Sequence, residues 1–84
     1  MITYRTNPDD VRGNVFQAWR WAKARLTWLE GRGHDIQLGR AFRQDGFVCS
    51  FAKPSWAGDH CGPIAKTGAD AIVDSVLEYE KTLD

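Results

Sequence analysis

The residues in this chain with chemistry suited to catalysis or metal binding are two cysteines and two histidines. Asp59, His60 and Cys61 are consecutive, and His34 and Cys49 precede them. A structural zinc site takes about four ligands, usually with a closely spaced cysteine pair, and this sequence has no such pair. A Cys–His nucleophile needs both side chains within hydrogen-bond reach, but neighbours along a strand point to opposite faces. We therefore predict no catalytic residue, no metal and no cofactor.

A second set of residues is suited to binding. The chain has four tryptophans in 84 residues, and three of them lie between positions 19 and 28. Trp21, Arg25, Trp28 and Arg32 follow one another at steps of 4, 3 and 4, which places them on one stripe of a helix. Tryptophan and arginine are enriched at the centres of protein interfaces. We predict that this stripe, together with Trp56 from a loop, contacts a partner.

The same stripe also has a purely structural interpretation. Indoles dominate the cores of small domains, so the last helix or the loop that carries Trp56 could cover the stripe. An intermediate arrangement is expected, in which Trp21 is buried on the flank of the helix and Trp28 is more exposed.

The helix that positions this stripe has a separate apolar face. Asn7 followed by Pro8 is typical of a helix start, and Gly13 predicts either a kink or a second start at Asn14. Gly31 is typical of a helix end. Apolar residues at helical spacing predict the core-facing stripe, which consists of Val15, Trp19, Ala22, Leu26 and Leu29.

A β-hairpin is predicted after this helix, with strands over 34–44 and 47–53. Asp45-Gly46 is typical of a two-residue type I′ turn, which would pair Gln44 with Phe47 and Phe42 with Cys49. The face turned toward the core would then carry Ile36, Leu38, Phe42, Phe47, Cys49 and Phe51.

The remaining elements complete an α+β fold in one domain, residues 1–84. Residues 2–5 and 59–61 are expected to add short strands, and Thr67 with Asp70 predicts the start of the last helix. That helix has an apolar stripe of Ala69, Ile72, Val76, Tyr79 and Leu83. We predict two helices and an antiparallel sheet of three or four strands, in the order (β)-α-β-β-(β)-α.

Charge is distributed unevenly along the chain. Residues 1–44 hold eight basic and four acidic residues, whereas residues 45–84 hold three basic and seven acidic ones, so that the net charge is zero. Such a dipolar chain favours a protein partner, or a second copy in a homodimer, over a phosphate backbone. With no signal peptide and no apolar run of about 18 residues, we expect a cytoplasmic protein with reduced thiols and no membrane partner.

Residues 14–84 resemble the small alpha-beta-alpha sandwich domain of tailed-phage proteins. The resemblance is carried by Ala18-Trp19 and its helix, by the Asp45-Gly46 hairpin and by residues 62–72, Gly-Pro-Ile-Ala-Lys-Thr-Gly-Ala-Asp-Ala-Ile. It implies a phage or mobile-element accessory protein that binds a host protein complex, for example an inhibitor of host defence of the anti-CRISPR type. The closing helix is also similar to those of small antitoxin and double-stranded-RNA-binding-like folds.

Two other functions remain open from the sequence. The interleaved aromatic and basic residues could bind single-stranded nucleic acid by base stacking, although the zero net charge and the acidic last helix favour this less. The opposed charges of the two helices could also pair across a two-fold axis in a self-associating structural protein.

Overall fold

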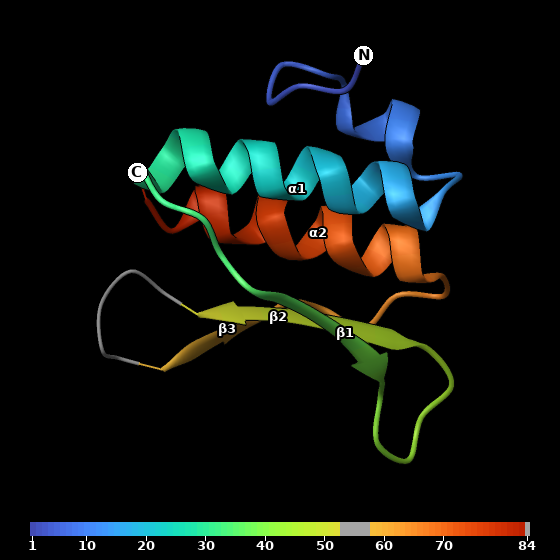
Figure 1. Cartoon of the computed structure of the whole chain (residues 1–84). Helices are drawn as coiled ribbons and strands as arrows, with labels where there is room; N and C mark the ends of the chain where they lie inside the picture. Colours follow the sequence, from blue (N-terminus) through green and yellow to red (C-terminus); the bar gives the residue numbers. More distant parts are fainter. Residues whose placement is uncertain (53–57, 84) are drawn as a thin grey trace.

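Within residues 1–52 and 58–83, which the computed structural model describes, the chain forms two α-helices on one face of an antiparallel sheet (Figure 1). Its elements are the 3-10 helix η1 (Pro8–Val11), α1 (Val15–Glu30), β1 (Ile36–Arg40), β2 (Phe47–Ala52), β3 (Asp59–Cys61) and α2 (Gly68–Lys81). The strand order is β1-β2-β3. The predicted α+β class is therefore confirmed. Residues 2–5 form a turn, closed by the Thr6 N–H and the Thr3 carbonyl, and not a strand.

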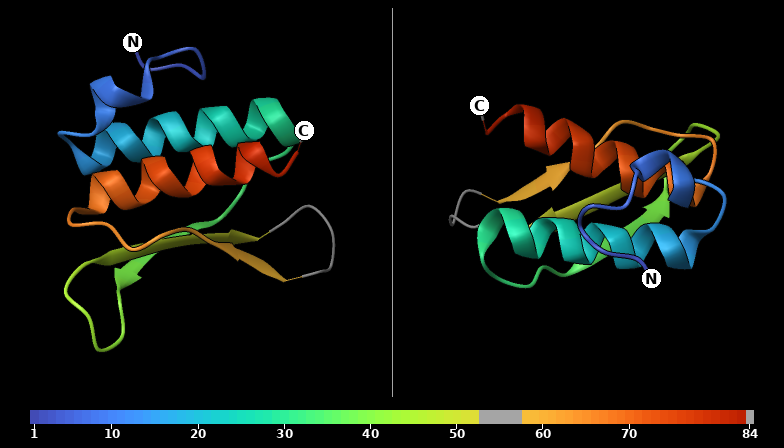
Figure 2. Two further views of the ribbon diagram at one scale, coloured as in Figure 1. Left: turned by 180° about the vertical axis from the view of Figure 1, so that it is seen from behind. Right: turned by 90° about the horizontal axis from the view of Figure 1, so that it is seen from above.

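Helix α2 is the element around which the others are arranged. It lies between α1 and the sheet in the side views, and seen from above α1 runs beside it over β1 (Figure 1, Figure 2). Its buried residues spread over more than a single stripe, as expected for a helix that contacts both a sheet and another helix. They are Ala69, Ala71, Ile72, Val73, Ser75, Val76 and Tyr79. No helix in the described ranges is long and apolar enough to span a lipid bilayer.

The ends of the helices follow their capping residues. The Asn7 side chain accepts a hydrogen bond at the start of η1, and the Asn14 side chain accepts from the N–H groups of Phe16 and Gln17. The chain therefore starts a second helix at Asn14, one of the two arrangements predicted from Gly13. Gly31 ends α1 in the left-handed conformation, at φ 73°. Thr67 caps α2 by accepting from the Asp70 N–H, as predicted.

The buried face of α1 differs from the prediction. Ala18, Trp21, Ala22 and Leu26 are buried, whereas Trp19 is 40% exposed. At 100° per residue the buried face is turned by roughly 60° from the expected stripe. Both the predicted and the observed face of α1 carry apolar residues. The position of α2 therefore determines which of the two is buried. The small side chains of Ala18 and Ala22 let the two helices approach closely.

The predicted hairpin forms, but its first strand is Ile36–Arg40 instead of 34–44, and its register differs. Leu38 pairs with Cys49 and Arg40 with Phe47, which is a shift of four residues. Phe42, expected to face the core, is 82% exposed in the loop between the strands. Because the shift is even, the other predicted core-facing residues stay on the same face of the sheet.

A contact distant in sequence explains the shifted register. The main chain of Phe47 pairs with Ala65, with N–H to oxygen distances of 2.8 and 2.9 Å. A Cβ atom on Gly46, at φ 141°, would lie 2.6 Å from Ile64 Cγ2. Gly46 therefore serves a close approach of two segments and not a two-residue turn, and the loop lengthens to bring it there.

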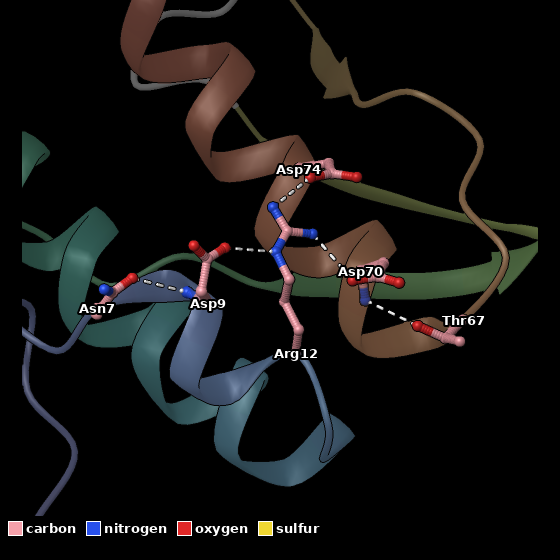
Figure 3. A network of polar contacts seen from close by, with 6 residues as sticks. All are labelled: Asn7, Asp9, Arg12, Thr67, Asp70 and Asp74. Atoms are coloured by element: carbon pink, nitrogen blue, oxygen red, sulfur yellow. Dashed lines mark hydrogen bonds and ion pairs between the residues drawn. The ribbon is translucent and has the colours of Figure 1, made fainter.

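Arg12, which directly follows η1, binds the carboxylate of Asp9 in η1 and those of Asp70 and Asp74 in α2 (Figure 3). These contacts hold η1 against α2. The guanidinium donates to Asp9 at 3.0 Å, to Asp70 at 2.9 Å and to Asp74 at 2.8 Å. These hydrogen bonds lower the pKa of Asp70 and raise the pKa of Arg12. Asp70 and Asp74 are therefore half-buried and paired rather than exposed on the outer face of α2.

Replacing Arg12 should weaken the fold in a pH-dependent way. Arg12→Met is expected to lower the free energy of unfolding by about 1–2 kcal/mol at pH 7. The lowered pKa of Asp70 means that its contribution is present above the unfolded-state pKa, about 3.9, and is lost as the pH falls through the folded-state pKa.

Urea unfolding of wild type and variant should therefore give curves that converge below about pH 4. Arg20→Met is the matched control, because Arg20 is exposed and forms no ion pair with the described residues. An equal loss of stability at pH 7 and in acid would contradict this role of Arg12.

Candidate functional site

The residues of the predicted binding stripe divide between the core and the surface. Trp21 is fully buried and belongs to the contact between α1 and α2, whereas Trp28 is 54% exposed, as the intermediate arrangement predicts. Trp21 therefore cannot touch a partner, because no part of its ring reaches the solvent. Trp56 lies outside the described residues. Arg32 is exposed and borders a cavity of about 270 Å³ together with Lys23 and His34.

Trp28 is stacked on the N-terminal segment. Its ring lies 4.9 Å from the ring of Tyr4, centroid to centroid, at an interplanar angle of 12°. The Arg25 guanidinium lies 5.1 Å from the Trp28 ring, and the Arg5 guanidinium 5.5 Å from the Tyr4 ring. Each ring of this stacked pair thus has a guanidinium close to it. This stack covers part of the Trp28 ring that a partner would otherwise contact.

Arg25 is engaged within the fold. Its guanidinium donates to both carboxylate oxygens of Glu80 on α2 and, at 2.7 Å, to the main-chain oxygen of Tyr4. It therefore ties the N-terminal segment, α1 and α2 together. The role of Arg25 in contacting a partner stays a prediction, and within the fold its charge is paired with Glu80.

Three other aromatic side chains, on α1, on β2 and in the loop after β1, each have a cation over the ring. Lys23 Nζ lies 6.0 Å from the ring of Trp19, and the guanidinium of Arg40 lies 5.9 Å from the ring of Phe47. The Arg43 guanidinium lies 5.0 Å from the ring of Phe42, in the loop after β1. We call these six residues the cation–aromatic border. A nearby aromatic ring, Phe16, is 74% exposed at the start of α1.

The sequence pattern alone does not indicate that the cation–aromatic border is a site. It places Trp19, Phe42 and Phe47 in the core because their spacing is compatible with a buried stripe and a buried strand face. A signal was available in the close spacing of Trp19 with Lys23 and of Phe42 with Arg40 and Arg43. This spacing indicates a surface site only when it is known which face of α1 is buried and how the hairpin strands are paired.

The cysteines and histidines occupy separate positions. Cys49 faces the helices and is buried, whereas Cys61 pairs with Ser50 on the opposite face and is exposed. Both thiols are free. His60 Nε2 donates to the Ser75 carbonyl at 3.1 Å, and His34 Nδ1 donates to a carbonyl at 2.8 Å. Within 1–52 and 58–83 no three histidine, cysteine or acidic side chains lie close enough to share a metal ion.

The two thiols should differ sharply in reactivity. Burial raises the pKa of Cys49 to about 11, so its thiol stays protonated and enclosed near neutral pH. Titration of the native protein with a disulfide reagent at pH 8 should show fast reaction of Cys61 and reaction of Cys49 only on unfolding. Cys61→Ser should remove the fast phase, and two fast thiols in the wild type would contradict the assignment.

Within residues 1–52 and 58–83 the cysteines and histidines therefore do not form a shared chemical site. Comparisons of the chain with protein-family models, with curated proteins and with solved structures found no match. The assignment of a function therefore rests on the side chains themselves, and the resemblance to phage domains stays a prediction.

Proposed function

We propose that this chain is a non-enzymatic protein-binding module, and that the cation–aromatic border is its contact surface. The observation that carries the proposal is the outward placement of Trp19 with Lys23 over its ring. Large aromatic rings that remain exposed beside arginine or lysine match the composition of interface hot spots. Exposed apolar groups of this kind, when they gather on one part of a surface, mark interaction sites.

The paired arrangement also suits the energetics of binding. A cation held over a ring restricts the side chains before a partner arrives, so less conformational entropy is lost on association. Lys23, Arg40 and Arg43 keep their charges accessible, because none of them forms an ion pair with the described residues. The border can therefore offer both apolar area and positive charge to the same partner.

The biological setting that we propose follows from the resemblance of residues 14–84 to phage domains. In that setting the chain is a phage or mobile-element accessory protein, present in the host cytoplasm, and its partner is a host protein. The surface described above does not depend on this setting, and it can be tested without knowledge of the partner.

Selection of random peptides from a display library on the immobilised protein tests the surface. We expect enriched peptides whose binding falls about tenfold or more in Trp19→Ala and in Lys23→Ala, because truncated hot-spot residues typically have effects of this size. The melting temperature of Lys23→Ala should change little, since Lys23 is exposed.

Trp28→Ala is the matched comparison, because Trp28 is also an exposed indole on α1 but is stacked on Tyr4. The proposal fails if no peptide is enriched. It also fails if Trp28→Ala abolishes binding while Trp19→Ala and Lys23→Ala leave it unchanged, since the contact surface would then lie on the opposite flank of α1.

A further inference from the structure

Strand β1 has a free edge with main-chain groups at defined positions. It is an outer strand of the described sheet, and β2 is its neighbour there. The Ala41 N–H donates to Gly46, which makes Gln37–Ser50 and Gly39–Val48 the hydrogen-bonded pairs of this antiparallel ladder. The N–H and C=O groups of the intervening residues, Ile36, Leu38 and Arg40, therefore point away from β2.

The main-chain hydrogen bonds that β2 forms on its side away from β1 support this assignment. The Cys49 carbonyl accepts from Gly62, and Phe47 pairs with Ala65, so both residues direct their main-chain groups away from β1. Their partners in β1 are Leu38 and Arg40, which accordingly have no main-chain partner in β2. No other strand within residues 1–52 and 58–83 pairs with this edge.

One flank of α1 runs along this edge. At one end, the side chains of Val15 and Leu38 both lie within 3.4 Å of the position that a Cβ atom on Gly68 would occupy. At the other end, Lys23 and Asp35 border the same cavity. Val15 and Lys23 are two turns apart on one side of α1, so this flank follows β1 from Leu38 back to Asp35. Leu38 itself is 37% exposed.

The charged side chains beside this edge have a small net positive charge. Lys23, Arg40 and Arg43 lie beside β1 and its loop, against the acids Asp35 and Asp45. Four acidic residues elsewhere in the fold are paired with arginines. Asp9, Asp70 and Asp74 bind Arg12, and Glu80 binds Arg25. An incoming segment that supplies carboxylates would therefore complement this edge.

We infer that an extended, acidic peptide segment of a protein partner binds as an additional strand on the free edge of β1, beneath the flank of α1 that carries Trp19 and Lys23. Strand addition uses main-chain hydrogen bonds for affinity and alternate side chains for specificity. The inference rests on the proposed function and deepens it, because it names the chemistry of the partner and the way in which it docks.

The free edge distinguishes this partner from two others. A nucleic-acid backbone offers phosphate oxygens, which would repel the outward carbonyl groups of Ile36, Leu38 and Arg40. A second copy of this chain would bring the same excess of arginine and lysine to the edge. A peptide strand alone supplies N–H donors and C=O acceptors at the spacing of β1 together with negative charge.

The test uses a short synthetic peptide that alternates valine and glutamate, and the full chain. Binding is followed by titration, and hydrogen exchange of the backbone amides is followed by NMR. We expect the amides of Ile36, Leu38 and Arg40 to gain protection on binding, whereas those of Gln37 and Gly39 are protected already. A fully N-methylated version of the peptide, which keeps its carboxylates, should bind at least about tenfold more weakly.

Two substitutions at one position separate the main chain from the side chain. Leu38→Pro removes an outward N–H without removing a ladder hydrogen bond, and Leu38→Ala removes the same side chain but keeps that N–H. Leu38→Pro should bind the peptide about tenfold more weakly than Leu38→Ala. The N-methylated peptide provides the same comparison on the wild-type protein.

The outcomes distinguish this inference from the proposed function. If the peptide binds but N-methylation has no effect, strand addition is overturned while a protein-binding surface remains. If oligothymidylate binds and the peptide does not, both are overturned. If the protection of the β1 amides rises with protein concentration in the absence of peptide, a second copy occupies the edge and the inference is wrong.

Discussion

The packing of α2 against both α1 and the sheet is the constraint on which the rest of the structure depends. It requires close approach on both sides, and the residues there are correspondingly small. A Cβ atom on Gly62 would lie 2.5 Å from the Cβ atom of Ser75, so only glycine permits the chain to cross α2 at this point. The buried Ser75 hydroxyl donates to the Cys49 carbonyl at 3.2 Å, which links α2 directly to β2.

The same packing brings the basic and acidic halves of the chain together. Arg12 and Arg25 from the N-terminal half bind the acids of α2, and the hydroxyl of Tyr79 on α2 donates to Glu30 at the end of α1. Burial and this carboxylate raise the pKa of Tyr79 to about 12. These ion pairs neutralise part of the charge asymmetry seen in the sequence. What remains at the border beside β1 is a local excess of positive charge.

Features set by neighbours in the sequence could be predicted, and features set by distant contacts could not. The caps at Asn14, Gly31 and Thr67 act within a few residues, so the local sequence alone places these helix ends. The hairpin register depends on Gly46 meeting residues 64–65, and the buried face of α1 depends on α2. The internal partner of Arg25 lies 55 positions away, which no local pattern reveals. The cation–aromatic border could not be predicted from the sequence, because it depends on both the buried face of α1 and the hairpin register.

Helix α2 is also the last of the described elements in the order of the chain. Trp21, Leu26 and Phe51 are buried in the same core as residues 69–79 of α2. While the ribosome still encloses those residues, the emerged part of the chain has two strands and a helix with no layer to pack between them. The core therefore cannot close until α2 has left the ribosome, and the nascent chain exposes its indoles to chaperones until then.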